Sequence, residues 1–62
     1  MTSLKKVREA QGLSQRALAA RAGIAQSLLS DFETGRRKPY PKARRQLARA
    51  LKTPITTLFP EV

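Results

Sequence analysis

Two short amphipathic segments joined by a tight turn, within residues 13–35, constrain the fold of this chain most strongly. Ser14 is a good N-cap, because its hydroxyl can accept a hydrogen bond from a free backbone N–H at the start of a helix. Leu18 and Ala22 recur at i and i+4, which gives an apolar stripe on a helix of about two turns. Gly23 can end this helix, since glycine takes the left-handed conformation at no steric cost. The sequence therefore predicts two helices packed across a short turn.

The apolar pattern resumes after the turn and predicts the second helix of the pair. Ile24 restarts it, Leu29 and Phe32 follow at spacings of five and three, and Gly35 closes the helix. Ala19, on the first helix, is small where the second must cross closely. The residues that this pattern leaves facing outward are Gln26, Ser27, Leu28, Asp31 and Thr34.

A further helix is expected before this pair. Thr2 or Ser3 can cap it, and it runs to about Gln11, where Gly12 stops it. Its apolar face consists of Leu4, Val7 and Ala10.

Prolines mark the helices that follow residue 35. Residues 36–40 are expected to form an irregular loop, and Pro41 suits the first turn of a helix that continues to about Leu51. Pro54 opens a short last helix that Pro60 ends. A chain of 62 residues has room for one small core. We therefore expect a single all-α domain of five helices over residues 1–62.

The composition favours a polyanionic partner. Thirteen Lys and Arg oppose four acidic residues, for a formal net charge of +9. The chain has no cysteine, no apolar run near the ~20 residues of a membrane span, and no signal-peptide pattern. These features predict a cytoplasmic protein that does not enter a membrane, and no small-molecule ligand is evident.

Catalysis is not expected from this set of residues. The chain has no His or Cys, and its four acids offer no paired-acid or nucleophile–base arrangement. There is also no metal-binding cluster and no glycine-rich loop for phosphate. We expect neither an enzyme nor a cofactor.

The whole pattern resembles the helix-turn-helix of the lambda-repressor-like or Cro-like regulators of phages and bacteria, often called the XRE family. The segments LKKVREAQGLSQ, FETGRRKPYP and QLARAL match its flanks, and the resemblance covers roughly Leu4 to Phe59. It implies a compact five-helix domain, with the helix-turn-helix at about residues 14–34, that binds a specific double-stranded DNA and regulates transcription as a repressor. The matching positions of the motif are Leu18, Ala19, Ala22, Gly23, Ile24, Leu29 and Phe32.

The resemblance also implies an ion pair between Arg8 and Glu33. A carboxylate beside Phe32 needs a fixed partner, and an arginine can offer two parallel donors, although both groups could instead be solvated. Two positions depart from the family pattern. Arg44 stands where members usually carry Leu or Ile, and Lys52 stands where they often carry Gly.

Gln26 is the main candidate for reading a base, because the helix that starts near it would enter the major groove with its N-terminal residues. Its amide can donate to N7 of adenine and accept from N6–H. Gln15 matches the family position whose amide supports that glutamine and touches phosphate. The alternative is that both glutamines are ordinary solvated residues.

Three neighbours of Gln26 are further candidates for base contacts. Ser27 could bond a base or serve only as a cap, and Leu28 could meet a thymine methyl or be partly packed. Asp31 could accept from cytosine N4, hold a basic side chain such as Arg36, or be solvated.

Backbone contacts are expected on both flanks of the reading helix. Arg44, Arg45 and Arg49 are expected to add only long-range attraction or to be solvated. The candidates for phosphate are Gln15, Arg16, Thr34, Arg36, Arg37 and Lys38.

A domain this small reads few base pairs, so a homodimer on a palindromic operator is expected. Phe59, Val62 and Tyr40 are apolar groups without an evident core position, and they are the candidates for a two-fold contact. Phe59 could instead fill the core under the last helix.

The alternative function is a protein-interaction module, such as the antitoxin of a toxin–antitoxin pair. Leu28 and the C-terminal apolar residues would then form the docking surface. A third possibility is nonspecific binding to RNA or an anionic membrane. Among regulators, a phage Cro-like repressor, a restriction–modification controller and an antitoxin fit the sequence equally.

Overall fold

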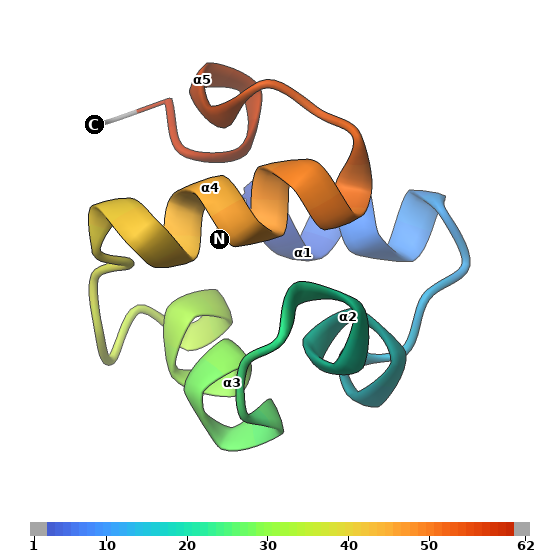
Figure 1. Ribbon diagram of the computed structural model, residues 1–62, viewed down its shortest axis with the longest axis horizontal. Helices are drawn as coiled ribbons and strands as arrows, with labels where there is room; N and C mark the ends of the chain where they lie inside the picture. The colour runs from blue at the N-terminus through green and yellow to red at the C-terminus, as the bar shows by residue number, and fades with distance from the viewer. Residues whose placement is uncertain (1–2, 61–62) are drawn as a thin grey trace.

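The structure is a computed structural model that describes residues 3–60. All the regular secondary structure of this range is helical, with no β-strand (Figure 1). The five helices are α1 (Ser3–Ala10), α2 (Gln15–Ala22), α3 (Gln26–Thr34), α4 (Pro41–Leu51) and α5 (Ile55–Leu58). This confirms the expected all-α, five-helix fold.

The ends of α2 and α3 follow from local chemistry. The hydroxyl of Ser14 accepts a hydrogen bond from the backbone N–H of Ala17 over 3.0 Å, as an N-cap should. Gly23 ends α2 with φ of 73°, and Gly35 ends α3 with φ of 83°, both in the left-handed region. Because α2 ends at Ala22 and α3 begins at Gln26, the turn between the two helices is short, and the helices pack against each other.

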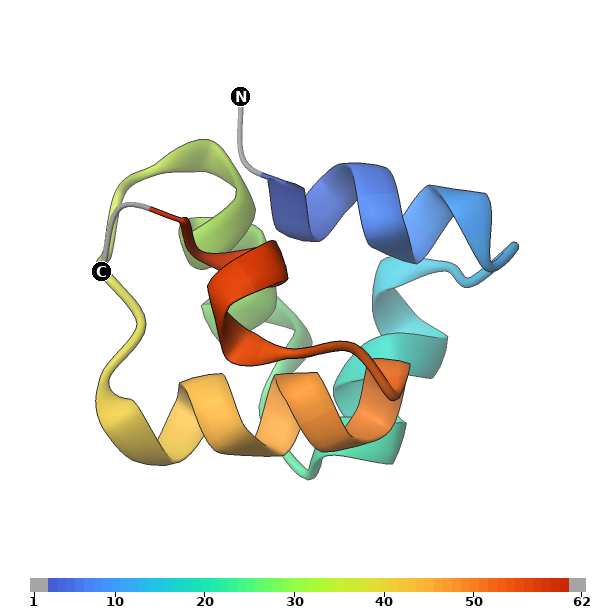
Figure 2. The same ribbon diagram turned by 90° about the horizontal axis from the view of Figure 1, so that it is seen from above.

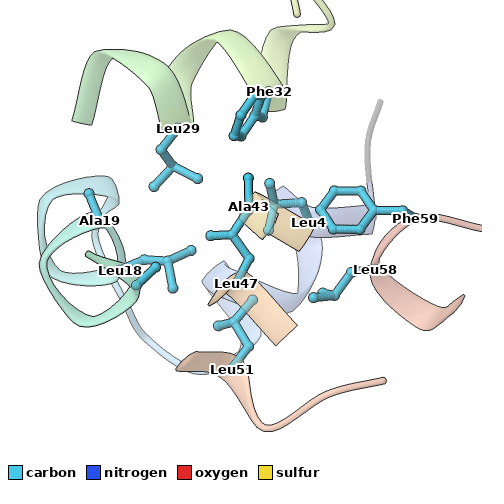
Figure 3. Close-up of a cluster of buried hydrophobic side chains, with 11 residues drawn as sticks. Leu4, Leu18, Ala19, Leu29, Phe32, Ala43, Leu47, Leu51, Leu58 and Phe59 are labelled. Carbon is cyan, nitrogen blue, oxygen red and sulfur yellow. The ribbon is translucent and has the colours of Figure 1, made fainter. Parts of the chain in front are cut away.

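One small core joins all five helices. Leu29 and Phe32 of α3 point toward the same interior as Ala43 and Leu47 of α4 (Figure 3). Helix α4 packs against α2, and α5 packs against both α1 and α4 (Figure 2). The buried apolar residues are Leu4, Leu18, Ala19, Ala22, Leu29, Phe32, Ala43, Leu47, Leu51, Leu58 and Phe59.

Phe59 corrects one of the predictions made from the sequence. Its exposed fraction is 4%, because it packs against the core beside α5 instead of facing solvent (Figure 3). The alternative, that Phe59 fills the core, is what the structure shows, so Phe59 is not available for a two-fold contact. Val62 lies outside the described residues.

Helix α1 also differs in detail from its prediction. Ser3 is the first described residue of the helix and not a residue that precedes it, and Thr2 lies outside the described range. Ala10 is exposed, so the buried face of α1 is made by Leu4 with the half-buried Val7. Arg8 lies buried beside them.

Both departures from the family pattern are accommodated in α4. Arg44 is half-buried and donates from Nη1 to the backbone oxygen of Pro39 over 2.8 Å. Lys52 caps the C-terminus in the left-handed region with φ of 51°. The helix therefore ends at the residue expected, although the capping residue carries a side chain.

Candidate nucleic-acid interface

Helix α3 turns its first residues to solvent. Gln26 and Ser27 are both exposed, and the backbone of Ala25 precedes them in an extended conformation. Leu28 is half-buried and packs against the core with part of its side chain, so its contact with a thymine methyl stays a prediction. The polar start of α3 can therefore enter a groove, with Leu28 at its edge.

Asp31 lies further along the solvent side of α3. Its Oδ2 is 3.6 Å from Nε of Arg37, and the side chains are 29% and 67% exposed. The basic residue beside Asp31 is thus Arg37, and not Arg36 as suggested from the sequence. At that exposure the pair fixes Arg37 only weakly.

Three exposed cations, Arg36, Arg37 and Lys38, follow α3 directly. The backbone N–H groups of Arg36 and Arg37 donate to the backbone oxygen of Asp31, at 2.9 and 3.3 Å. These bonds continue the helix end into the loop and place the cations next to α3. We call these three residues the cationic rim.

Thr34 has its hydroxyl directed at its own helix. The hydroxyl donates to the backbone oxygen of Ser30 over 3.0 Å, with a longer contact of 3.4 Å to that of Asp31. Thr34 is exposed, but a hydroxyl used in this way must turn before it can donate to a phosphate.

A buried polar network joins the first three helices. Nε of Arg8 lies 2.6 Å from Oε2 of Glu33, and its Nη2 lies 3.2 Å from Oε1. The side chains are 9% and 2% exposed, so the ion pair is formed within the protein. Nη1 of Arg8 donates to the backbone oxygen of Leu13 over 2.7 Å. The hydrogen bond that Arg8 donates to Glu33 raises the pKa of the Arg8 guanidinium; burial opposes this, while the charges of Glu33 and Glu9 add to it.

Gln15 belongs to the same network. Its Nε2 donates to Oε1 of Glu33 over 2.9 Å. The donor end of the amide is thus turned to Glu33, because a buried carboxylate is a stronger acceptor than a neutral amide. The support of Gln26 by the Gln15 amide stays a prediction. Arg16 is exposed beside it, at the start of α2.

The loop before α4 contains two anchors that sequence reasoning missed. The Arg44–Pro39 hydrogen bond holds the backbone of the loop, and the ring of Tyr40 meets the ring of Phe32 edge-on, with centroids 6.2 Å apart. Tyr40 is 47% exposed, so it is anchored on one side and open on the other. Nothing in the sequence indicates that Arg44 reaches back five residues to the backbone of Pro39.

Other kinds of site find no support among the described residues. No group of three or more His, Cys, Asp or Glu side chains within residues 3–60 is arranged to hold a metal ion. None of the helices in that range is long and apolar enough to span a bilayer.

The fold, the exposed start of α3 and the cationic rim define a helix-turn-helix regulator of transcription that binds double-stranded DNA in a sequence-specific manner. A family model described as "Helix-turn-helix" matches residues 4–58. The chain belongs to this family, of the XRE type that the sequence resembles.

A solved structure supports the same assignment. The restriction-modification controller protein C.AhdI from Aeromonas hydrophila is 35% identical in sequence and superimposes with a TM-score of 0.88. The match covers 92% of this chain and 86% of that one. A search of curated proteins returned no significant match.

Proposed function

We propose that the protein is a repressor that binds a palindromic operator as a homodimer, in the cytoplasm of a bacterium or a phage-infected cell. The observation that carries this proposal is the exposed start of α3, at Gln26 and Ser27, on the same helix that the cationic rim follows. Gln26 reads an adenine, while Arg36, Arg37 and Lys38 bind phosphates. Occupying promoter DNA then excludes the polymerase.

The phosphate contacts on the other flank come from the start of α2. The free N–H groups of a helix N-terminus bind phosphate without a formal charge, and exposed Arg16 can add one. The side chain of Gln15 takes part only if it leaves Glu33. After Gln26, Ser27 is the next candidate for a base contact, because it is exposed. Leu28 and Asp31 rank below it, because both are half-buried.

Similarity to C.AhdI favours a controller role over the phage-repressor and antitoxin roles. A controller of this kind would regulate a restriction–modification system. The two-fold contact is proposed to involve Tyr40, the one large apolar side chain among residues 3–60 that is markedly exposed.

The proposal is tested by selecting duplexes from a random library with the purified protein. The selected duplex and a scrambled one are then titrated at several salt concentrations. Both should show steep salt dependence, with the selected duplex bound at least about a thousandfold more tightly. Equal affinity for both sequences would overturn the proposal. Sedimentation with and without the selected duplex measures dimerisation, and a palindromic consensus gives the half-site spacing.

A further inference from the structure

Four cations share one face of α4. Lys42, Arg45, Arg49 and Lys52 follow each other at spacings of three, four and three, which is the repeat of a single helix face. All four are exposed, whereas the opposite face carries the buried Ala43, Leu47 and Leu51. We call these four residues the basic stripe.

The basic stripe lies on the solvent face of α4, opposite the side chains that α4 turns to the core. The core-facing side chains of α3 and α4 point toward a common interior (Figure 3), so the solvent faces of the two helices look in different directions. A duplex seated on the start of α3 and a duplex that follows the basic stripe would therefore contact two separate surfaces of the protein. Any partner of the stripe approaches from another side of the protein.

The basic stripe is unfavourable for the free protein. Its members are like charges at i,i+3 and i,i+4, which repel each other along the helix. No acidic residue occurs between Glu33 and Glu61, and within residues 3–60 no salt bridge of 4.0 Å or less reaches the stripe. Lys42 also lies in the first turn of α4, where the helix dipole favours an acid. A bound polyanion would reverse each of these effects.

The chemistry of the stripe fits the backbone of duplex DNA better than other anions. The stripe has no aromatic or aliphatic residue, whereas protein interfaces depend on a buried apolar centre and single strands on stacking. From residue 42 to 52 the helix rises about 15 Å, over which a duplex presents about nine phosphates. Cations alone, in a row, are what sequence-independent phosphate binding needs.

We propose that the basic stripe binds the phosphate backbone of a second segment of double-stranded DNA while α3 holds the operator. Binding at the stripe is independent of base sequence. This inference rests on the proposed function for the position of the operator, and it adds the ability to hold two DNA segments on one protein.

A sandwich assay tests the proposal. The selected duplex is immobilised and loaded with protein, and a labelled duplex of random sequence is then added. The test variant is Arg45→Gln/Arg49→Gln, and the matched control is Lys5→Gln/Lys6→Gln, which removes the same charge from exposed positions of α1. The wild type and the control should capture the labelled duplex. The stripe variant should bind it about tenfold more weakly, with a salt slope lower by about 2, while still binding the immobilised duplex as the control does.

Several outcomes would overturn the proposal. They are no capture by the wild type, equal capture by the stripe variant and the control, or loss of operator binding in the stripe variant alone. Capture of poly-glutamate in place of the duplex would assign the stripe to acidic proteins instead. If the wild-type protein bound all duplexes equally, only the proposed function would be overturned. The stripe variant and the control could still be compared by their capture of the labelled duplex on an immobilised duplex of random sequence.

Discussion

Gln15 of α2 donates its side-chain N–H to the carboxylate of Glu33 of α3, across 2.9 Å. A carboxylate only accepts hydrogen bonds, so this contact turns the amide nitrogen of Gln15 inward and leaves its oxygen to face away. The same carboxylate holds Arg8. The network thus fixes the start of α2 against the end of α3, and with it the angle at which the reading helix is presented.

Replacing Glu33 should be severely destabilising. Glu33→Ala leaves the Arg8 guanidinium buried without its partner, which costs about 3 to 5 kcal/mol. A 62-residue domain has little more stability than that, so the variant should be largely unfolded at 25 °C. Urea unfolding followed by circular dichroism gives the value. Glu9→Ala is the control at an exposed position on α1. A loss under about 1 kcal/mol for Glu33→Ala would show that the pair is not needed for the fold.

The different roles proposed for α3 and the cationic rim predict different effects of two substitutions. Gln26→Ala should lower affinity for the selected duplex by about 1 to 3 kcal/mol and relax the preference at one adenine. Arg37→Ala should weaken selected and scrambled duplexes alike and reduce the salt slope by about 1. Fluorescence anisotropy with both duplexes at three salt concentrations separates the effects. If the two variants lose the same affinity on every duplex, the assigned roles are wrong.

Asp31 should modulate phosphate binding without reading a base. Asp31→Asn removes the exposed contact with Arg37, so stability should change by less than about 0.5 kcal/mol. The loss of a negative charge beside the cationic rim should tighten binding to scrambled duplexes. Repeating the library selection with the variant is the check, and an unchanged consensus is expected. Loss of a cytosine preference would instead assign Asp31 to base readout.

Periodicity was sufficient to predict the helices, whereas their arrangement was an expectation from the family resemblance. The apolar spacing of Leu18, Ala22, Leu29 and Phe32, with Gly23 between the helices, predicts two short helices that turn these residues to one core, as observed. The amphipathic pattern failed at Phe59, because a short last helix has too few residues to show which side faces the core. A single aromatic residue there can be read either as core or as surface.

The site was less predictable than the fold. Its outward residues could be found from the helix period. The structure confirms that Gln26 and Ser27 are exposed but does not test their contacts with DNA. The partner of Gln15 could not be found in this way, since Glu33 lies 18 residues away and the choice between it and Gln26 depends on burial. The same holds for Arg37, whose approach to Asp31 depends on how the chain turns at Gly35.

The C-cap of α4 offers a stabilising substitution. Lys52 has φ of 51°, a conformation that strains a residue with a Cβ but not glycine. Lys52→Gly should therefore be about 1 kcal/mol more stable than Lys52→Ala, which also removes the charge but keeps the Cβ. Thermal unfolding of both variants in the same buffer makes the comparison. Equal stability, or a less stable glycine variant, would contradict the strain.

Substitutions of Phe59 and Tyr40 should affect stability and dimerisation to different extents. Phe59 is 4% exposed, so Phe59→Ala should cost about 3 kcal/mol or more through the cavity it leaves. Tyr40 is 47% exposed and touches Phe32 only at a ring edge, so Tyr40→Ala should cost about 1 kcal/mol. If Tyr40 lies in the two-fold contact, Tyr40→Ala should shift the dimer toward monomer in sedimentation experiments with the selected half-site. Phe59→Leu, which keeps the core apolar, should leave the association unchanged. A weaker dimer in Phe59→Leu but not in Tyr40→Ala would place the contact at the C-terminal end of the protein instead.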